Sequence, residues 1–129
     1  ISVHNSLLAH NWDRNPRLQG GTTVEFINNV IYNWGGPSGW NGANLSDSPS
    51  TGLPVMLNFV GNFYKRGRSS PSLPMLYAKP LQSRTRVYAH SNYGPTKTTS
   101  SGDEWTISSV PSSARASSSV VTESGVTTR

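Results

Sequence analysis

Residues 24–34, VEFINNVIYNW, carry the clearest structural pattern in the chain. The stretch begins with apolar, polar and apolar residues in turn, continues through an amide pair, and then becomes apolar again. A period of two is typical of a short strand with one buried face, and Asn tolerates the left-handed conformation of a sharp turn. The stretch therefore predicts a short strand, a turn and a second short strand.

Similar segments recur on both sides of this stretch. Residues 1–11 superpose on it at an offset of 23, residues 57–67 at an offset of 33, and residues 86–94 more weakly at a further 30. Repeats of about 20 to 35 residues are typical of solenoids, in which each coil buries its inward face only when a neighbour stacks on it. We therefore predict a short, all-β parallel β-helix; four unrelated hairpin turns are the alternative.

The alignment places one small or amide residue at the same point of each repeat. These residues are Ser6, Asn29, Asn62 and Asn92. Stacked strands lie about 4.8 Å apart, so equivalent side chains come to lie above one another. Because an amide both donates and accepts hydrogen bonds, we predict a ladder of these side chains along the stack.

Composition limits the class of protein. The chain of 129 residues fits one domain, and its 12 Gly, 9 Pro and 13% charged residues argue against a helical bundle or a coiled coil. The absence of Cys excludes disulfides, thiolate metal sites and a cysteine nucleophile. A net charge of +5 favours an anionic partner. No apolar run approaches the roughly 20 residues that span a bilayer, so we expect no membrane partner.

Two regions are expected along the chain. Residues 1–109 would hold the coils and their long loops, and the Ser-rich residues 110–129 would form a loosely structured tail or cover. The loop that follows Trp34 is rich in Gly, Ser and Pro and contains Trp40. The two indoles would either pack over the coil or stack on a sugar.

The segment HNWDRNPR, residues 10–17, is the strongest candidate for a binding site. Pro16 stiffens the backbone and disfavours the helical region for Asn15, so Arg14 and Arg17 would project from a held, extended segment. Two fixed guanidinium groups can clamp a carboxylate or a phosphate. In the alternative, Arg14 pairs with Asp13 at the surface and Arg17 lies along the coil.

Other charged residues give weaker signals. Lys65 and Arg66 would either extend an anion-binding groove or simply solvate a loop. The three histidines share no metal-ligand spacing, and the six acidic residues are scattered along the chain, so we predict no metal ligand. Nucleic-acid binding would rest on charge alone and is not expected.

Three of the quoted stretches together resemble the pectate lyase family 1 of polysaccharide lyases. They are ISVHNSLLAHNWDRNPRL, VEFINNVIYNWG and NFVGNFYKRG, which cover residues 1–67; the resemblance continues faintly through residues 84–94 and 112–126. Members of the family are longer, so the chain would correspond to a middle to C-terminal portion. The resemblance implies a right-handed parallel β-helix, a secreted enzyme, and β-elimination of polygalacturonate.

The resemblance also implies roles for individual residues. Arg14 matches the base that withdraws the C5 proton of galacturonate, and Arg17 would hold a uronate carboxylate, with Lys65 and Arg66 as further substrate contacts. Gln19 stands where some members carry another Arg. Calcium is the implied cofactor, although the family's calcium ligands lie mostly upstream of the matching segment.

Whether the chain is itself an enzyme is left open. The alternative is a non-catalytic β-helix fragment or module that binds acidic glycan. A solenoid that begins at Ile1 would expose strand edges and core at its first coil. We therefore expect a homo-oligomer that associates through this end.

Overall fold

The computed structural model describes residues 1–35, 42–46, 52–71, 74–79 and 84–121. This part of the chain forms short strands and two turns of 3-10 helix, η1 (Glu104–Ile107) and η2 (Ser112–Ala114). The strands are β1 (Ser2–His4), β2 (Leu7–Ala9), β3 (Arg17–Gln19), β4 (Thr23–Ile27), β5 (Val30–Tyr32), β6 (Ala43–Ser46), β7 (Met56–Val60), β8 (Phe63–Lys65), β9 (Leu76–Ala78), β10 (Arg86–His90) and β11 (Arg115–Ala116). No helix in the described ranges is long and apolar enough to cross a membrane.

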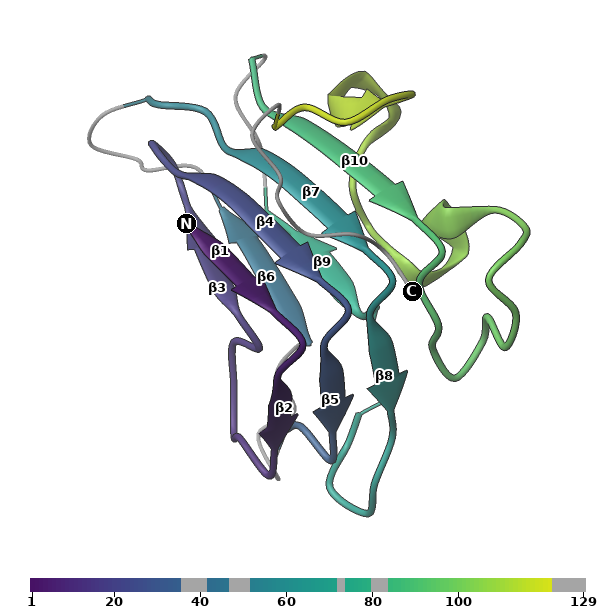
Figure 1. The fold of residues 1–129 in the computed structure, drawn as a ribbon. Coiled ribbons are helices and arrows are strands. Elements are labelled where there is room, and N and C mark those ends of the chain that lie inside the picture. Colours follow the sequence, from purple (N-terminus) through teal and green to yellow (C-terminus); the bar gives the residue numbers. More distant parts are fainter. Residues whose placement is uncertain (36–41, 47–51, 72–73, 80–83, 122–129) are drawn as a thin grey trace.

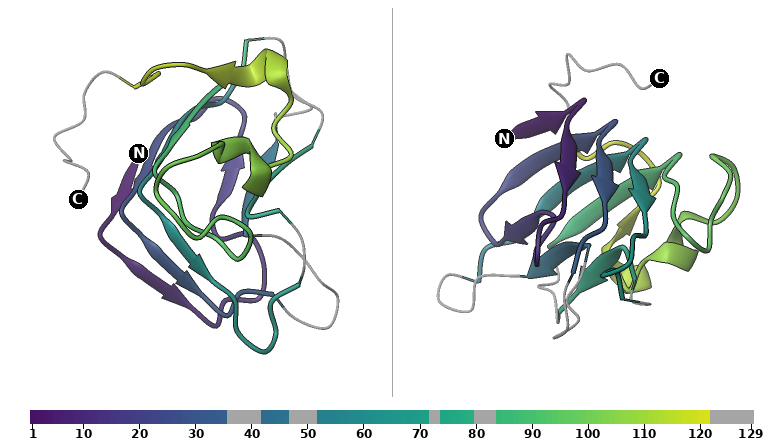
Figure 2. Two further views of the ribbon diagram at one scale, coloured as in Figure 1. Left: turned by 90° about the vertical axis from the view of Figure 1, so that its right-hand side faces the viewer. Right: turned by 90° about the horizontal axis from the view of Figure 1, so that it is seen from below.

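The strands form three parallel sheets that surround one interior (Figures 1 and 2). Sheet A has the order β1-β4-β7-β10-β11, sheet B the order β2-β5-β8, and sheet C the order β3-β6-β9. The chain visits the three sheets in turn, so β1–β3 form the first coil, β4–β6 the second and β7–β9 the third. This arrangement is a parallel β-helix, and it confirms the fold class predicted from the repeats.

The strand register matches the predicted offsets. Val3 pairs with Phe26, Phe26 with Phe59, and Phe59 with Ala89, which are the offsets of 23, 33 and 30 residues. In sheet B, Ile31 lies between Leu8 and Tyr64. The apolar positions that the sequence aligned therefore stack in columns along the axis.

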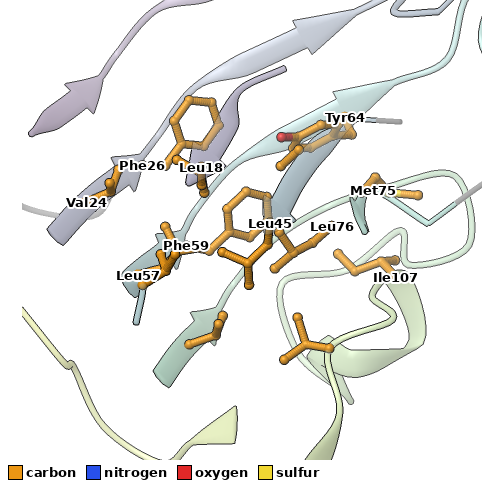
Figure 3. Close-up of a cluster of buried hydrophobic side chains, with 14 of the residues drawn as sticks. Leu18, Val24, Phe26, Leu45, Leu57, Phe59, Tyr64, Met75, Leu76 and Ile107 are labelled. Atoms are coloured by element: carbon orange, nitrogen blue, oxygen red, sulfur yellow. The ribbon is translucent and has the colours of Figure 1, made fainter. Parts of the chain in front are cut away.

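These columns form the core (Figure 3). The rings of Phe26 and Phe59 stack with their centroids 5.8 Å apart and their planes 11° apart. Both rings are buried, and burial of a side chain of this size contributes roughly 2–3 kcal/mol. Neighbouring columns bring Leu57 and Leu45 into the same cluster.

The turns from sheet A to sheet B repeat one conformation. The residue just before the ladder position has a positive φ in each of the three coils and again after β10: Asn5 at 51°, Asn28 at 55°, Gly61 at 64° and Ser91 at 54°. The left-handed conformation therefore belongs to the residue before the ladder position and not to the ladder residue itself. Gly61 fits this place for a second reason, because a Cβ there would meet the side chain of Asn28.

The predicted ladder is present. Asn29 donates from its main-chain nitrogen and from Nδ2 to Asn62 Oδ1, both at 3.1 Å. Asn62 donates in the same way to Asn92 Oδ1, at 3.0 and 3.1 Å. The main-chain nitrogen of Ser6 donates to Asn29 Oδ1 at 3.1 Å, so the first position takes part through its backbone.

The described part of residues 110–129 covers two sides of the stack. Val110 and Ala114 are buried in the core cluster, and β11 adds a fifth strand to sheet A beside β10. Farther on, Ser119 and Val120 bond the side chain of Asn58 on the outer face of β7. Residues 110–121 thus pack on the last strand of sheet A and on the outer face of β7; residues 122–129 lie outside the described ranges.

Candidate functional site

The candidate residues lie on the connections from sheet B to sheet C. Residues 10–16 make this connection in the first coil, 33–42 in the second and 66–75 in the third, with 36–41 and 72–73 outside the described ranges. Because the strands pair in parallel register, the three connections leave the same side of the stack (Figure 1). One surface therefore collects segments from three coils.

Arg14 lies on the first connection with its side chain 54% exposed. Its φ of 61° is left-handed, so the backbone at Arg14 is not the extended segment that the sequence predicted, and the Asn15–Pro16 peptide is cis. Nε lies 3.2 Å from Asp13 Oδ2, which is the surface ion pair of the alternative interpretation. An exposed pair of this kind contributes about 0–1 kcal/mol, so a carboxylate ligand can compete with Asp13.

Arg17 begins β3 and is exposed, whereas the next residue, Leu18, is buried. The segment between the two arginines is attached to the second coil by main-chain hydrogen bonds. Asn15 N donates to Gly42 O at 2.7 Å, and Asn44 N donates to Pro16 O at 2.8 Å. These bonds hold the backbone from which both arginines project.

A side chain of the third coil also holds this segment. Tyr64 on β8 donates from its hydroxyl to the carbonyl oxygen of Asn15 at 2.8 Å. Burial raises the pKa of the Tyr64 hydroxyl well above its usual value, so the group is a neutral donor. Trp34 packs edge-on against the Tyr64 ring at 5.5 Å and is only 1% exposed. Trp34 therefore packs over the coil and stacks on no sugar; Trp40 lies outside the described ranges.

Lys65 and Arg66 lie at the end of β8 and just after it. Lys65 is exposed, its Nζ lies 6.0 Å from the ring centroid of Tyr32, and its column continues to Ala9 in the first coil. Arg66 donates from Nη2 to Ser70 O at 3.1 Å. The four predicted basic residues therefore lie at or beside the sheet B to sheet C connections, Arg14 and Arg17 on the first coil and Lys65 and Arg66 on the third.

One cross-link between these connections was not predicted. Ser69 N donates to Asn33 Oδ1 at 2.9 Å, and Asn33 Nδ2 lies 2.9 Å from His10 Nδ1. The cross-link joins all three coils at the start of their connections. Asn33 directly follows β5 and occupies the repeat position of His10, so the repeat alignment was the signal that could have found it.

The described residues do not fit a calcium site. They include no group of three or more His, Cys, Asp or Glu side chains that could hold a metal ion. Calcium takes six to eight oxygen ligands, with several carboxylates converging. Asp47 and Glu123 lie outside the described ranges.

Comparison with known proteins gives a consistent result. The chain is 40% identical over 67 residues to the probable pectate lyase C of Aspergillus flavus, covering 52% of this chain and 14% of that protein. It is 39% identical over 70 residues to the protein of the same name from Neosartorya fischeri, covering 54% and 15%. For Emericella nidulans the values are 33% over 73 residues, covering 50% and 17%.

These similarities support a relationship to pectate lyases over about half of the chain. The aligned region spans between 14% and 17% of the length of these three relatives. No family model matches the chain. No solved structure matches it significantly.

Proposed function

We propose that the chain is part of a secreted polysaccharide lyase that cleaves polygalacturonate, or a related acidic polysaccharide, by β-elimination. The observation that carries the proposal is the pair Arg14 and Arg17, both exposed on one segment that backbone hydrogen bonds hold against the second coil. The similarity to proteins named probable pectate lyase C supports the substrate class. The net charge of +5 suits a polyanion.

In the proposed reaction, the C5–H bond of a galacturonate breaks and its electron pair forms the C4–C5 double bond. The C4–O bond breaks, and the leaving oxygen takes up a proton from solvent. Arg14 accepts the C5 proton and Arg17 holds the uronate carboxylate by charge-assisted hydrogen bonds. A free guanidinium keeps its proton far above neutral pH, so the role of base requires a neutral guanidine at this position in the reacting complex.

Lys65 and Arg66 are proposed to bind the same polysaccharide chain farther along. Lys65 lies two strands from Ala9 of the first coil, a separation of about 10 Å at the usual strand spacing. At that separation they would contact a different sugar from the one held by Arg14 and Arg17. Two pairs of cations would thus contact carboxylates along one polyuronate.

The test is the ultraviolet absorbance of the unsaturated uronate product, with the full chain, polygalacturonate, and calcium either added or chelated. We expect product from the wild type and a loss of at least about 100-fold in Arg14→Ala. Arg84→Ala is the matched control, because Arg84 is exposed and lies on the connection from sheet C to sheet A.

Three outcomes would count against the proposal or part of it. No product under either calcium condition, from a chain with a native β spectrum, contradicts the lyase. Binding without product would instead mean a non-catalytic module for acidic glycan. Undiminished product from Arg14→Ala would remove Arg14 from the role of base.

A further inference from the structure

Tyr64 reaches across the interior from the third coil to the segment that carries the two arginines. It is 1% exposed, and its hydroxyl donates to Asn15 O at 2.8 Å. That carbonyl lies between Arg14 and Arg17 in the chain. The ring itself packs against Trp34 at 5.5 Å and Phe59 at 5.8 Å, so the direction of the hydroxyl is set by the core (Figure 3).

We propose that Tyr64 is a positioning residue that holds Arg14 and Arg17 in the geometry required by the reaction. This inference rests on the proposed function and adds to it a residue that touches no substrate. Tyr64 acts only through the main chain of Asn15.

The backbone at Arg14 needs such a restraint. A residue with a side chain adopts a φ near 61° at a free-energy cost, and it keeps that conformation only where surrounding contacts impose it. Two buried contacts do so here, from Asn15 N to Gly42 O and from the Tyr64 hydroxyl to Asn15 O. Without the hydroxyl, the Asn15 carbonyl loses its donor in a site that is 2% exposed.

Loss of this restraint should affect catalysis more than binding. A base that is displaced by about 1 Å can lose up to about 100-fold in rate, because the transition state requires a closer alignment than the bound substrate does. Binding would continue through Arg17, Lys65 and Arg66, whose charges do not depend on the hydroxyl. The expected signature of Tyr64→Phe is therefore a lower kcat at a nearly constant KM.

The experiment compares Tyr64→Phe with Phe59→Leu in the full chain. Tyr64→Phe keeps the ring and removes the hydroxyl, whereas Phe59→Leu reduces packing in the same cluster and keeps the hydroxyl and the Trp34 contact of the Tyr64 ring. We expect kcat to fall about tenfold in Tyr64→Phe with KM within about twofold of the wild type. Phe59→Leu should lower stability and keep kcat at a temperature well below its unfolding midpoint.

A second measurement does not depend on activity. Hydrogen exchange of the Asn15 amide, followed by NMR, should accelerate by about tenfold or more in Tyr64→Phe and not in Phe59→Leu. In the wild type, the Tyr64 hydroxyl proton should exchange slowly enough to be observed. A rapidly exchanging hydroxyl proton in the folded wild type would overturn the inference even if Tyr64→Phe failed to fold.

The two readouts separate this inference from the proposed function. Accelerated Asn15 exchange in Tyr64→Phe alone, with no product from any variant, would support the restraint and reject the lyase. Wild-type kcat and wild-type exchange in Tyr64→Phe would overturn the inference while leaving the lyase intact. Equal losses of kcat in Tyr64→Phe and Phe59→Leu would also overturn it, because the effect would then follow core stability.

Discussion

The Oε2 atom of Glu104 lies 3.1 Å from both the main-chain nitrogen and Nδ2 of Asn92. Asn92 Oδ1 accepts the same pair of hydrogen bonds from Asn62, so Glu104 takes the place of the next ladder amide. The other carboxylate oxygen lies 3.0 Å from Lys97 Nζ; the Lys97 side chain is 5% exposed and that of Glu104 10%. The ladder therefore ends in a largely buried ion pair.

Removal of either charge at this end should be strongly destabilising. Glu104→Gln leaves the 6%-exposed Lys97 without its partner charge, and Lys97→Met leaves the carboxylate without its partner charge; each should cost about 3 kcal/mol of unfolding free energy. The double variant should lose less than the sum of the two, as measured by urea unfolding. Additive losses would mean that the two side chains do not stabilise each other.

The interior of the ladder should be more sensitive to substitution than its first position. Asn62→Ala removes the acceptor for both Asn29 donors and the donor to Phe26 O, all in a buried site, so we expect a loss of at least about 3 kcal/mol. Ser6→Ala is the matched control, because Ser6 joins the ladder through its backbone, and it should change stability by less than about 0.5 kcal/mol. Thermal and urea unfolding would measure the stability of both variants. Equal losses of stability would contradict a larger contribution from the interior of the ladder.

Tyr64 should make stability depend on alkaline pH. Burial raises the pKa of its hydroxyl above the usual value, so the folded chain keeps a proton that the unfolded chain releases above about pH 10. The contribution is fully present below that pH and is lost as the pH rises toward the folded-state pKa, by at most about 1.4 kcal/mol per pH unit.

The comparison that isolates this contribution is the wild type against Tyr64→Phe. The difference in unfolding free energy between them should be constant below about pH 10 and change above it in favour of the variant. Urea unfolding at about pH 8 and about pH 11 would measure it. A difference that is independent of pH would contradict the assignment of Tyr64 as a buried neutral donor.

The cross-link at Asn33 predicts the tautomer of His10. Ser69 N–H can only donate, so the Asn33 atom facing it is the oxygen, and Nδ2 must face His10 Nδ1. Neutral His10 therefore accepts at Nδ1 and carries its proton on Nε2. Nitrogen chemical shifts of the ring would show this form, and a ring protonated at Nδ1 would contradict it.

Replacement of a neighbouring glycine tests the same cross-link. A Cβ at Gly67 would overlap the Asn33 side chain, so Gly67→Ala should displace Asn33 and release His10. We expect the tautomer preference of His10 to weaken in Gly67→Ala and in Asn33→Ala. Gly102→Ala, at a position with no atom near the added Cβ, controls for glycine replacement as such and should leave the His10 spectrum unchanged, although its φ of 100° makes a modest loss of stability expected there.

The repeated part of the fold could be predicted because each coil obeys the same rule. Phe26, Phe59 and Ala89 align in the sequence and pair in the structure, and the amides from Asn29 to Asn92 form the expected ladder. The ion pair of Lys97 and Glu104 could not be predicted in this way. Glu104 follows Asn92 by only 12 residues and has no counterpart in the other coils.

The candidate site was predictable only in part, because its residues lie on connections that do not repeat from coil to coil. The pattern of two arginines around Pro16 identified the segment, but not the left-handed backbone at Arg14 or the ion pair with Asp13. Tyr64 aligned with Ile31 as a core position, and nothing in that alignment indicated a hydroxyl contact with Asn15.

The coil repeat, the strand register and the ladder follow from the amino-acid sequence, because stacking makes equivalent positions of neighbouring coils meet at one fixed spacing. Which side chains meet across the irregular connections, as Tyr64 meets Asn15 and Asn33 meets His10, depends on the tertiary structure. Connections of unequal length have no period, so their partners are selected by packing and by the requirement that buried polar groups find a hydrogen bond.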